Sequence, residues 1–287
     1  MSHTHQLQLY WEKVANHLLD QDQEPWLQRK VRGMEERGDR IMRVTFRIHP
    51  YHRMAYERHT SYRYLLSLSI LIQNGRHYYL EEGVHEGAAT FLKDKMLGHR
   101  VTTETICPAE ETGFSEYVYR EDERIPSFSY DRREAVRYAE RWWDGANPAY
   151  PHFENDCTNF VSQCLRAGGL PTWGVPHQTR GWWYQNGKWS YSWSVAHAFK
   201  WYLSGSTKGQ VAREVFSADQ LSPGDIICYD FQGNDRFDHN TMVVKLNKDG
   251  MPLVNAHTTN SRHRYWDYKD STAYTPDIEY KFYTIGG

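Results

Sequence analysis

The residues best suited to chemistry lie in segment 155–161, Asn-Asp-Cys-Thr-Asn-Phe-Val. Asp156 is expected to cap a helix by accepting hydrogen bonds from its first backbone N–H groups, and Gly168-Gly169 is expected to end that helix. Cys157 then lies at the positive end of the helix dipole, which favours the thiolate and lowers the thiol pKa, although the Asp156 carboxylate opposes this. The sequence predicts a nucleophile at Cys157, with a buried, inert cysteine as the alternative.

A thiolate that cleaves an amide also needs a general acid to protonate the leaving amine, and histidine can accept and return that proton near neutral pH. His239 is the predicted partner, because it begins an apolar strand pattern, Asn-Thr-Met-Val-Val. A third group is expected to hold its ring in the working tautomer.

The predicted hairpin that follows His239 suggests what this third group is. If Lys248-Asp249-Gly250 is a three-residue loop, His257 faces Thr241 across the two strands. On that register His257 and Asn255 share the face of His239, offset by about 7 and about 13 Å at the rise of a strand. The nearer residue, His257, is predicted to orient His239, with Asn255 as runner-up. A bulge would undo this preference, and a locally bonded sheet histidine is the alternative for His257.

Helical cysteine, strand histidine and a polar group on the next strand together resemble the papain-like cysteine hydrolases of the NlpC and CHAP type. Segment 156–161 is similar to the Asp-Cys-Ser-Gly-Leu-Val motif of NlpC-type cell-wall peptidases, and Leu221-Ser222-Pro223-Gly224-Asp225 to their Pro-Gly-Asp strand entry. More specifically, segments 155–169, 238–239 and 257–258 resemble the bacterial putative amidase domain family within that group. The resemblance covers roughly residues 130 to 285.

This resemblance implies an amidohydrolase that works through a thioester and uses no cofactor. Cys157 would attack a peptide-like amide, His239 would relay the proton, and His257 would orient His239. The backbone N–H of Cys157 and the side chain of Tyr150, which matches an upstream tyrosine of NlpC-type enzymes, would lie near the oxyanion. The implied substrate is a peptide or cell-wall fragment such as a peptidoglycan stem peptide. A non-catalytic binding module on the same fold and an acyltransferase using the same Cys/His pair are the alternatives.

The predicted fold class is α+β, with two domains. Residues 1–120 are predicted to form a smaller α+β domain of one helix and a curved antiparallel sheet, because helical spacing near the N-terminus is followed by alternating strand patterns and an Asn74-Gly75 hairpin turn. The charged stretch 121–130 is the predicted linker. Residues 131–287 are predicted to form the papain-like domain, an antiparallel sheet behind the nucleophile helix, beginning with a helix capped by Asp131.

Composition narrows the function classes further. A net charge of −2 gives no electrostatic footprint for nucleic acid or an anionic membrane. The four cysteines lack metal-ligand spacing and His-Glu-x-x-His is absent, so no metal site is predicted. No signal or membrane-spanning pattern occurs, which predicts a cytoplasmic protein, and the oligomeric state stays open. Tryptophans within 173–202 are interpreted as core packing, with a substrate-stacking platform as the alternative.

Overall fold

Long antiparallel strands build the first part of the chain. The structure is a computed structural model that describes residues 2–17, 24–102, 128–205 and 211–286. Clustering of contacts divides it into unit 1, with Met1–Glu104, Thr259–Ser261 and Tyr268–Ala273, and unit 2, with the remaining residues. Most of the predicted linker, residues 121–127, and Cys107 lie outside the described residues.

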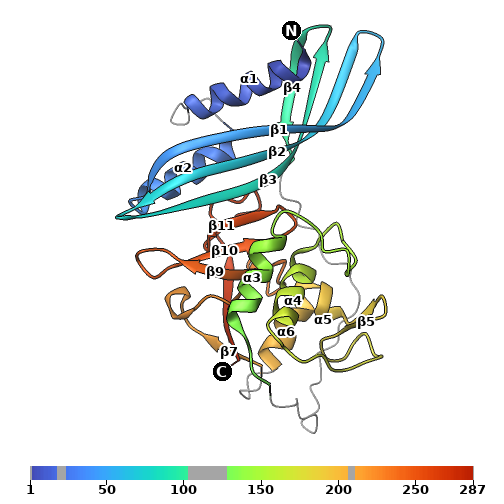
Figure 1. Ribbon diagram of the computed structural model, residues 1–287, viewed down its shortest axis with the longest axis vertical. Coiled ribbons are helices and arrows are strands. Elements are labelled where there is room, and N and C mark those ends of the chain that lie inside the picture. Colours follow the sequence, from blue (N-terminus) through green and yellow to red (C-terminus); the bar gives the residue numbers. More distant parts are fainter. Residues whose placement is uncertain (1, 18–23, 103–127, 206–210, 287) are drawn as a thin grey trace. The chain divides into compact units, whose positions relative to one another are not determined.

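The described residues of unit 1 form two helices beside an antiparallel sheet (Figure 1). The elements are α1 (His3–Asn16), α2 (Pro25–Glu36), β1 (Arg40–Tyr56), β2 (His59–Asn74), β3 (His77–Leu92) and β4 (Lys95–Val101), with strand order β1-β2-β3-β4. The Asn74-Gly75 turn is confirmed, because β2 pairs with β3 in register up to Asn74 opposite His77. The prediction of one helix was wrong. The helix that was not predicted, α2, starts with Pro25 at its first position. Proline fits there because the first residue of a helix has no hydrogen-bond partner for its N–H within the helix.

Unit 2 is a twisted sheet with helices packed on one face (Figure 1). Its helices are α3 (Arg132–Trp142), α4 (Cys157–Ala167), α5 (Tyr191–Ser194), α6 (Ala196–Gly205) and the short 3-10 helix η2 (Ala218–Gln220). Its strands are β7 (Ala212–Val215), β8 (Ile226–Asp230), β9 (His239–Leu246), β10 (Pro252–Ala256), β11 (Ser261–Tyr265) and β12 (Glu279–Ile285), in the order β11-β10-β9-β8-β12-β7. A separate small hairpin pairs β5 (Tyr184–Gln185) with β6 (Lys188–Trp189). The α+β class is confirmed.

The start of α3 is fixed to the Pro-Gly-Asp turn that leads into β8. Asp131 caps α3 as predicted, accepting from the backbone N–H groups of Arg133 and Glu134. Arg132, the next residue, donates to the fully buried Asp225 carboxylate at 2.6 Å. Asp225 also accepts the backbone N–H groups of Ser222 and Ile285. Asp225 therefore ties the turn, α3 and the last strand together, a structural role for the motif.

The core of unit 2 lies between its helices and its sheet. Phe160, Val161, Cys164 and Leu165 of α4 pack with Met242 and Val244 of β9 and with aromatic side chains from 173–202. The prediction of core packing is confirmed for Trp182, Trp183 and Trp193, which are at most 1% exposed, whereas Trp201 is 44% exposed. The aromatic residues thus supply the apolar area that holds α4 against the sheet.

Candidate active site

Cys157 is the first residue of α4, as predicted. Every residue from Cys157 to Leu165 is buried, so the helix is packed on all sides over its first two turns. The helix ends at Gly168, and Gly169 adopts a positive φ of 88°, the left-handed conformation that terminates helices at glycine. The local sequence pattern therefore predicted correctly that the thiol lies at the start of a helix.

Asp156 does not cap α4 as expected. Its side chain makes no capping hydrogen bond to the first turn. Instead Oδ1 accepts from the Phe153 backbone N–H at 3.0 Å and from Asn159 Nδ2 at 2.8 Å, while Oδ2 lies 2.7 Å from Nδ1 of His257. Both carboxylate oxygens therefore bond the preceding loop and two side chains, and neither bonds the backbone of the first turn of α4.

His257 forms a buried pair with Asp156. The ring is enclosed between Asp156 at Nδ1 and the carbonyl oxygen of Trp142, 2.7 Å from Nε2, and it stacks on Phe160 with ring centroids 4.1 Å apart. Both partners are hydrogen-bond acceptors, so a ring with a proton on each nitrogen satisfies both. Burial by itself raises the pKa of Asp156, but the hydrogen bonds from His257 and Asn159 outweigh it and hold that pKa below its usual value.

The register of the β9–β10 hairpin differs from the prediction by one residue. The loop itself is confirmed, because the Asn247 N–H donates to the Met251 carbonyl at 2.9 Å and Gly250 has a φ of 77°. A bulge between Leu253 and Val254 then shifts the pairing, so that Asn255 faces Met242 instead of Val243. A shift of one residue moves every later side chain to the other face of the sheet.

This shift separates the two histidines. Continued to the end of the hairpin, the register sets His257 opposite Asn240, on the face that contacts α4. His239 belongs to the opposite face, where its ring lies 5.6 Å from that of Tyr229 and 6.2 Å from that of Phe231. The expectation that His239 and His257 share a face was therefore wrong.

The sulfur of Cys157 touches the residue that follows each histidine. The backbone N–H of Asn240, directly after His239, and the side chain of Thr258, directly after His257, hydrogen bond to it. Asn240 also donates from Nδ2 to Thr158 Oγ1 at 2.9 Å, which joins the start of β9 to the first turn of α4. The structure thus brings Asp156, Cys157 and His257 together and sets the chain at His239 next to the thiol.

Burial governs the protonation of Cys157. The side chain is 4% exposed, and the loss of water raises its pKa above the usual value, with a further small rise from the Asp156 carboxylate. The hydrogen bonds from Asn240, Thr158 and Thr258 act in the opposite direction. The expected lowering of the Cys157 pKa at the helix start is wrong, because desolvation of the thiolate outweighs the helix dipole.

The two remaining predicted residues pack nearby. The Tyr150 ring stacks on Trp193 with centroids 5.9 Å apart, and the Arg166 guanidinium lies 6.0 Å from its centre. Asn255, the runner-up for the third group, donates to the Ala139 carbonyl at 3.3 Å and accepts the His263 N–H at 2.9 Å. The two ends of the Asn255 amide therefore link β10 to α3 and to β11.

Sequence reasoning missed Asp156 as the partner of His257. The two residues are 101 positions apart, so no local spacing links them. The one available signal was an acidic residue directly before a candidate nucleophile, which was interpreted as a helix cap. Within residues 2–17, 24–102, 128–205 and 211–286, no group of three or more His, Cys, Asp or Glu side chains is arranged to hold a metal ion.

The chain belongs to the family described as "Putative amidase domain", which matches residues 129–283 and suggests amide hydrolysis. It is 51% identical over 215 residues to YhbB, an uncharacterized protein of Bacillus subtilis (strain 168), covering 72% of this chain and 68% of that protein. It is 29% identical over 141 residues to YjcM, an uncharacterized protein of the same organism, covering 46% of this chain and 31% of that protein. No solved structure matches. Among the described residues, no helix is both long and apolar enough to cross a membrane.

Proposed function

We propose that unit 2 is a cysteine amidohydrolase of the papain-like, NlpC/CHAP type, which cleaves a peptide-like amide with Cys157 as the nucleophile. The observation that carries the proposal is the environment of the thiol. The thiol belongs to the first residue of α4 and accepts the backbone N–H of Asn240. The residue directly before it, Asp156, forms a buried pair with His257. A nucleophile, a buried carboxylate–histidine pair and a helix start within one small region are components of thiol-dependent amide cleavage.

In the proposed reaction the Cys157 sulfur attacks the amide carbonyl carbon and forms a tetrahedral oxyanion. The backbone N–H of Cys157, one of the first N–H groups of α4 that lack a partner within the helix, is the proposed donor to that oxyanion. Collapse breaks the C–N bond, the amine leaves with a proton taken from a histidine, and a thioester remains. Water then attacks the thioester, which returns the thiol and releases a carboxylic acid.

His239 is the proposed carrier of the proton. A general base needs a ring nitrogen that can face the sulfur, and both nitrogens of His257 are engaged by Asp156 and the Trp142 carbonyl. Because the His239 ring lies beside Tyr229, proton transfer requires this first residue of β9 to turn its side chain toward α4. Catalytic contacts often form only in the substrate complex. His257 is proposed to act through Asp156 by holding the turn that precedes Cys157.

The substrate proposed is a peptidoglycan stem peptide, and the test uses muropeptides released from purified bacterial cell wall. The full chain is incubated with the mixture, and products are identified by mass spectrometry. We expect cleavage by the wild type and by Cys164→Ala, which removes a buried thiol farther along the same helix, and none by Cys157→Ala. Equal cleavage by Cys157→Ala would eliminate the thiol mechanism. Addition of an amine acceptor distinguishes hydrolysis from acyl transfer, which would attach the acyl group to that amine.

Substitutions of the histidines then assign their roles. His239→Ala should abolish turnover while the stability of unit 2 is kept. His257→Ala should lower the free energy of unfolding of unit 2 as well as turnover, because it leaves the Asp156 carboxylate buried without its partner. If His257→Ala abolishes turnover at unchanged stability and His239→Ala is active, the roles of the two residues are reversed.

The burial of the thiol favours one second candidate, a non-catalytic module that binds peptides or wall fragments. A raised pKa leaves little thiolate at neutral pH. Calorimetry with the same muropeptides separates the two functions. Equal binding by the wild type and Cys157→Ala, with no product from either, supports the module.

A further inference from the structure

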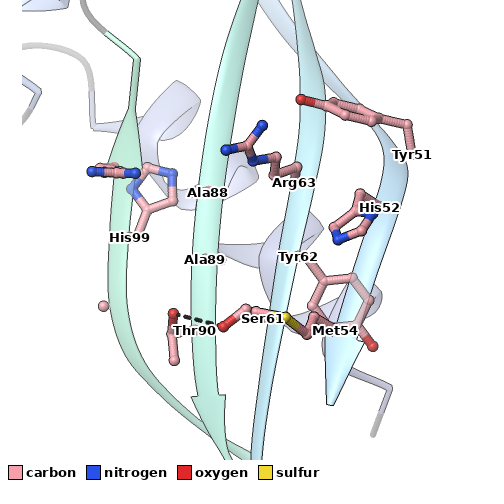
Figure 2. A pocket seen from close by; sticks show the side chains of 12 residues that line it. Tyr51, His52, Met54, Ser61, Tyr62, Arg63, Ala88, Ala89, Thr90 and His99 are labelled. Atoms are coloured by element: carbon pink, nitrogen blue, oxygen red, sulfur yellow. Dashed lines mark hydrogen bonds between the residues drawn. The ribbon is translucent and has the colours of Figure 1, made fainter. Parts of the chain in front are cut away.

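The outer face of the unit 1 sheet carries a pocket with no part in the proposed amidase site. One face of this sheet contributes buried residues to a core with α1, including Phe46, Tyr64 and Phe91, against which Trp11 packs. The pocket has a volume of about 700 Å³ and is lined by residues of β1, β2, β3 and β4 (Figure 2). That volume is within the range of sites for small organic ligands, roughly 300–1,000 Å³.

Strand register arranges the lining residues in two rows across the four strands. In the first row His52 pairs with Arg63, Arg63 with Ala88, and Ala88 with Arg100. A bulge at Tyr51 in β1 brings His52 opposite Arg63, since Pro50 faces Tyr64 directly before it. The row therefore carries three basic side chains, with a gap at Ala88 where the side chain is a single methyl group.

In the second row, every residue after the methionine of β1 is small or hydrophilic. The row runs Met54, Ser61, Thr90, Gly98, and the hydroxyl oxygens of Ser61 and Thr90 are 3.3 Å apart (Figure 2). An added Cβ at Gly98 would meet nothing within 4 Å, so the space above this row is open. Small side chains in the middle and long ones at the sides create the hollow, and the two hydroxyl groups offer hydrogen-bond donors within it.

The charged side chains that line the hollow are all positive. Two arginines, Arg63 and Arg100, are among its twelve lining residues, and none of the twelve is Asp or Glu. Arg63 and Arg100 are exposed, and in Figure 2 the Arg63 guanidinium lies over the strand that carries Ala88. The carboxylate of Glu86 lies on the same face but belongs to the next row along β3, opposite Leu65. Two guanidinium groups beside hydroxyl donors are suited to an oxyanion.

We propose that this hollow binds a small organic anion, a molecule with a phosphate or carboxylate group attached to a flat ring. Arg63 and Arg100 hold the anionic group above Ala88, the hydroxyl groups of Ser61 and Thr90 donate to its oxygens, and Tyr51, 51% exposed at the bulge, packs against the ring. The proposal is independent of the amidase function of unit 2. It gives unit 1 a role of its own in ligand binding.

The test is titration calorimetry of the full chain with phenyl phosphate. Benzoate in place of phenyl phosphate distinguishes phosphate from carboxylate as the preferred group, and inorganic phosphate measures the contribution of the ring. Each of Arg63→Gln and Arg100→Gln should weaken phenyl phosphate binding about tenfold or more, the usual effect of losing a charged hydrogen bond. Arg47→Gln is the matched control, because this exposed arginine lies on the same face of β1, opposite Ser67 and outside the pocket. It should change the affinity less than about twofold.

Three results would overturn the proposal. The first is the absence of binding by phenyl phosphate and benzoate at millimolar concentration. The second is an equal loss of affinity in Arg47→Gln, which would make the attraction a property of the whole basic face. The third is much tighter binding of a polyanion such as polyphosphate, equally weakened by Arg47→Gln, which would indicate an extended polymer track. Circular dichroism of each variant shows that the sheet is retained.

Discussion

The Asp156–His257 pair gives the sharpest test of how this site is built. In Asp156→Asn the amide oxygen can still accept from the Phe153 N–H and from Asn159, as Oδ1 does now. The atom that changes is Oδ2, 2.7 Å from Nδ1 of His257, which becomes an NH₂ group. Oδ2 also lies 3.5 Å from Nδ1 of the exposed His152. The substitution therefore removes the buried contact with His257 and this exposed one, and leaves the contacts of Oδ1 in place.

The expected cost follows from the burial and charge of this contact. Asp156 is 2% exposed and His257 is 3% exposed, so water does not replace the lost partner. Loss of a hydrogen bond to a buried, ionised carboxylate should lower the free energy of unfolding of unit 2 by about 2–3 kcal/mol at pH 7. His257→Gln should cost a similar amount, and the double variant should cost about 2 kcal/mol less than the sum of the two, since both remove the same interaction.

The contribution of Asp156 to the free energy of unfolding depends on pH, and its sign follows from the direction of the Asp156 pKa shift. The pKa of Asp156 is lower in the folded protein than its usual value, so folding favours the carboxylate. The resulting stabilisation is complete above the unfolded pKa, about 3.9, and is lost as the pH falls through the lower pKa of the folded state. The difference between the wild type and Asp156→Asn should therefore be full at pH 7 and should shrink below about pH 4.

Hydrogen–deuterium exchange of peptides from α4 at increasing urea concentration measures this stability for unit 2 alone. Asp249→Asn is the control, an exposed carboxylate in the same unit that pairs with Lys248, and it should change the stability by less than about 0.5 kcal/mol. The reasoning is refuted by a cost of Asp156→Asn as small as that of the control, or by additive effects in the double variant.

Three further predictions test packing and protonation elsewhere. Gly87→Ala should lower the stability of unit 1 by about 1–3 kcal/mol in urea unfolding, because the new Cβ overlaps the ring of a fully buried tyrosine, whereas Gly98→Ala, with open space around it, should cost much less; equal costs would contradict this packing. Burial raises the pKa of Asp238 to about 6, so the free energy of unfolding of unit 2 falls as the pH rises from about 4 to 6 and this carboxyl loses its proton. Asp238→Asn should flatten that pH dependence and stabilise unit 2 at pH 7 by about 1 kcal/mol. An unchanged pH dependence would contradict a raised pKa of Asp238. Alkylation of Cys157 by iodoacetamide should accelerate about tenfold per pH unit between pH 7 and 9 and should be faster than that of Cys164, whose pKa is raised further; a rate independent of pH would contradict a raised thiol pKa.

Elements specified by neighbouring residues could be predicted from the sequence. The helix that carries Cys157 depends on apolar spacing within eleven residues and on two glycines at its end, and both signals are local. Asp131 as a cap and the Asn74-Gly75 turn were predicted for the same reason. The helix α2 had local signals as well, a proline at its first position followed by buried residues at helical spacing (Trp26, Leu27, Lys30, Val31 and Met34).

The polar residues of the Cys157 segment could not be assigned from local spacing. Each can be interpreted as a cap, a ligand or a catalytic group, yet each bonds a residue distant in sequence. Thr158 accepts from Asn240, Asn159 accepts from Trp193 and Gln163 accepts from Tyr138. These buried contacts explain why the segment is rich in polar side chains although it has little exposed surface, since a buried polar group without a partner is costly.

The position of His257 shows why register is hard to predict from a hairpin alone. The turn residues determine the pairing only as far as Leu253, and the bulge that follows reverses the faces. Beyond the bulge, Asn255 bonds the Ala139 carbonyl and the His263 N–H, while His257 bonds Asp156 and the Trp142 carbonyl. Without the bulge these polar groups would face away from α3 and α4, and four buried or part-buried hydrogen bonds would be lost at about 1 kcal/mol or more each. Contacts with the helices therefore determine which histidine lies on the side of Cys157, and the two strands do not encode that choice by themselves.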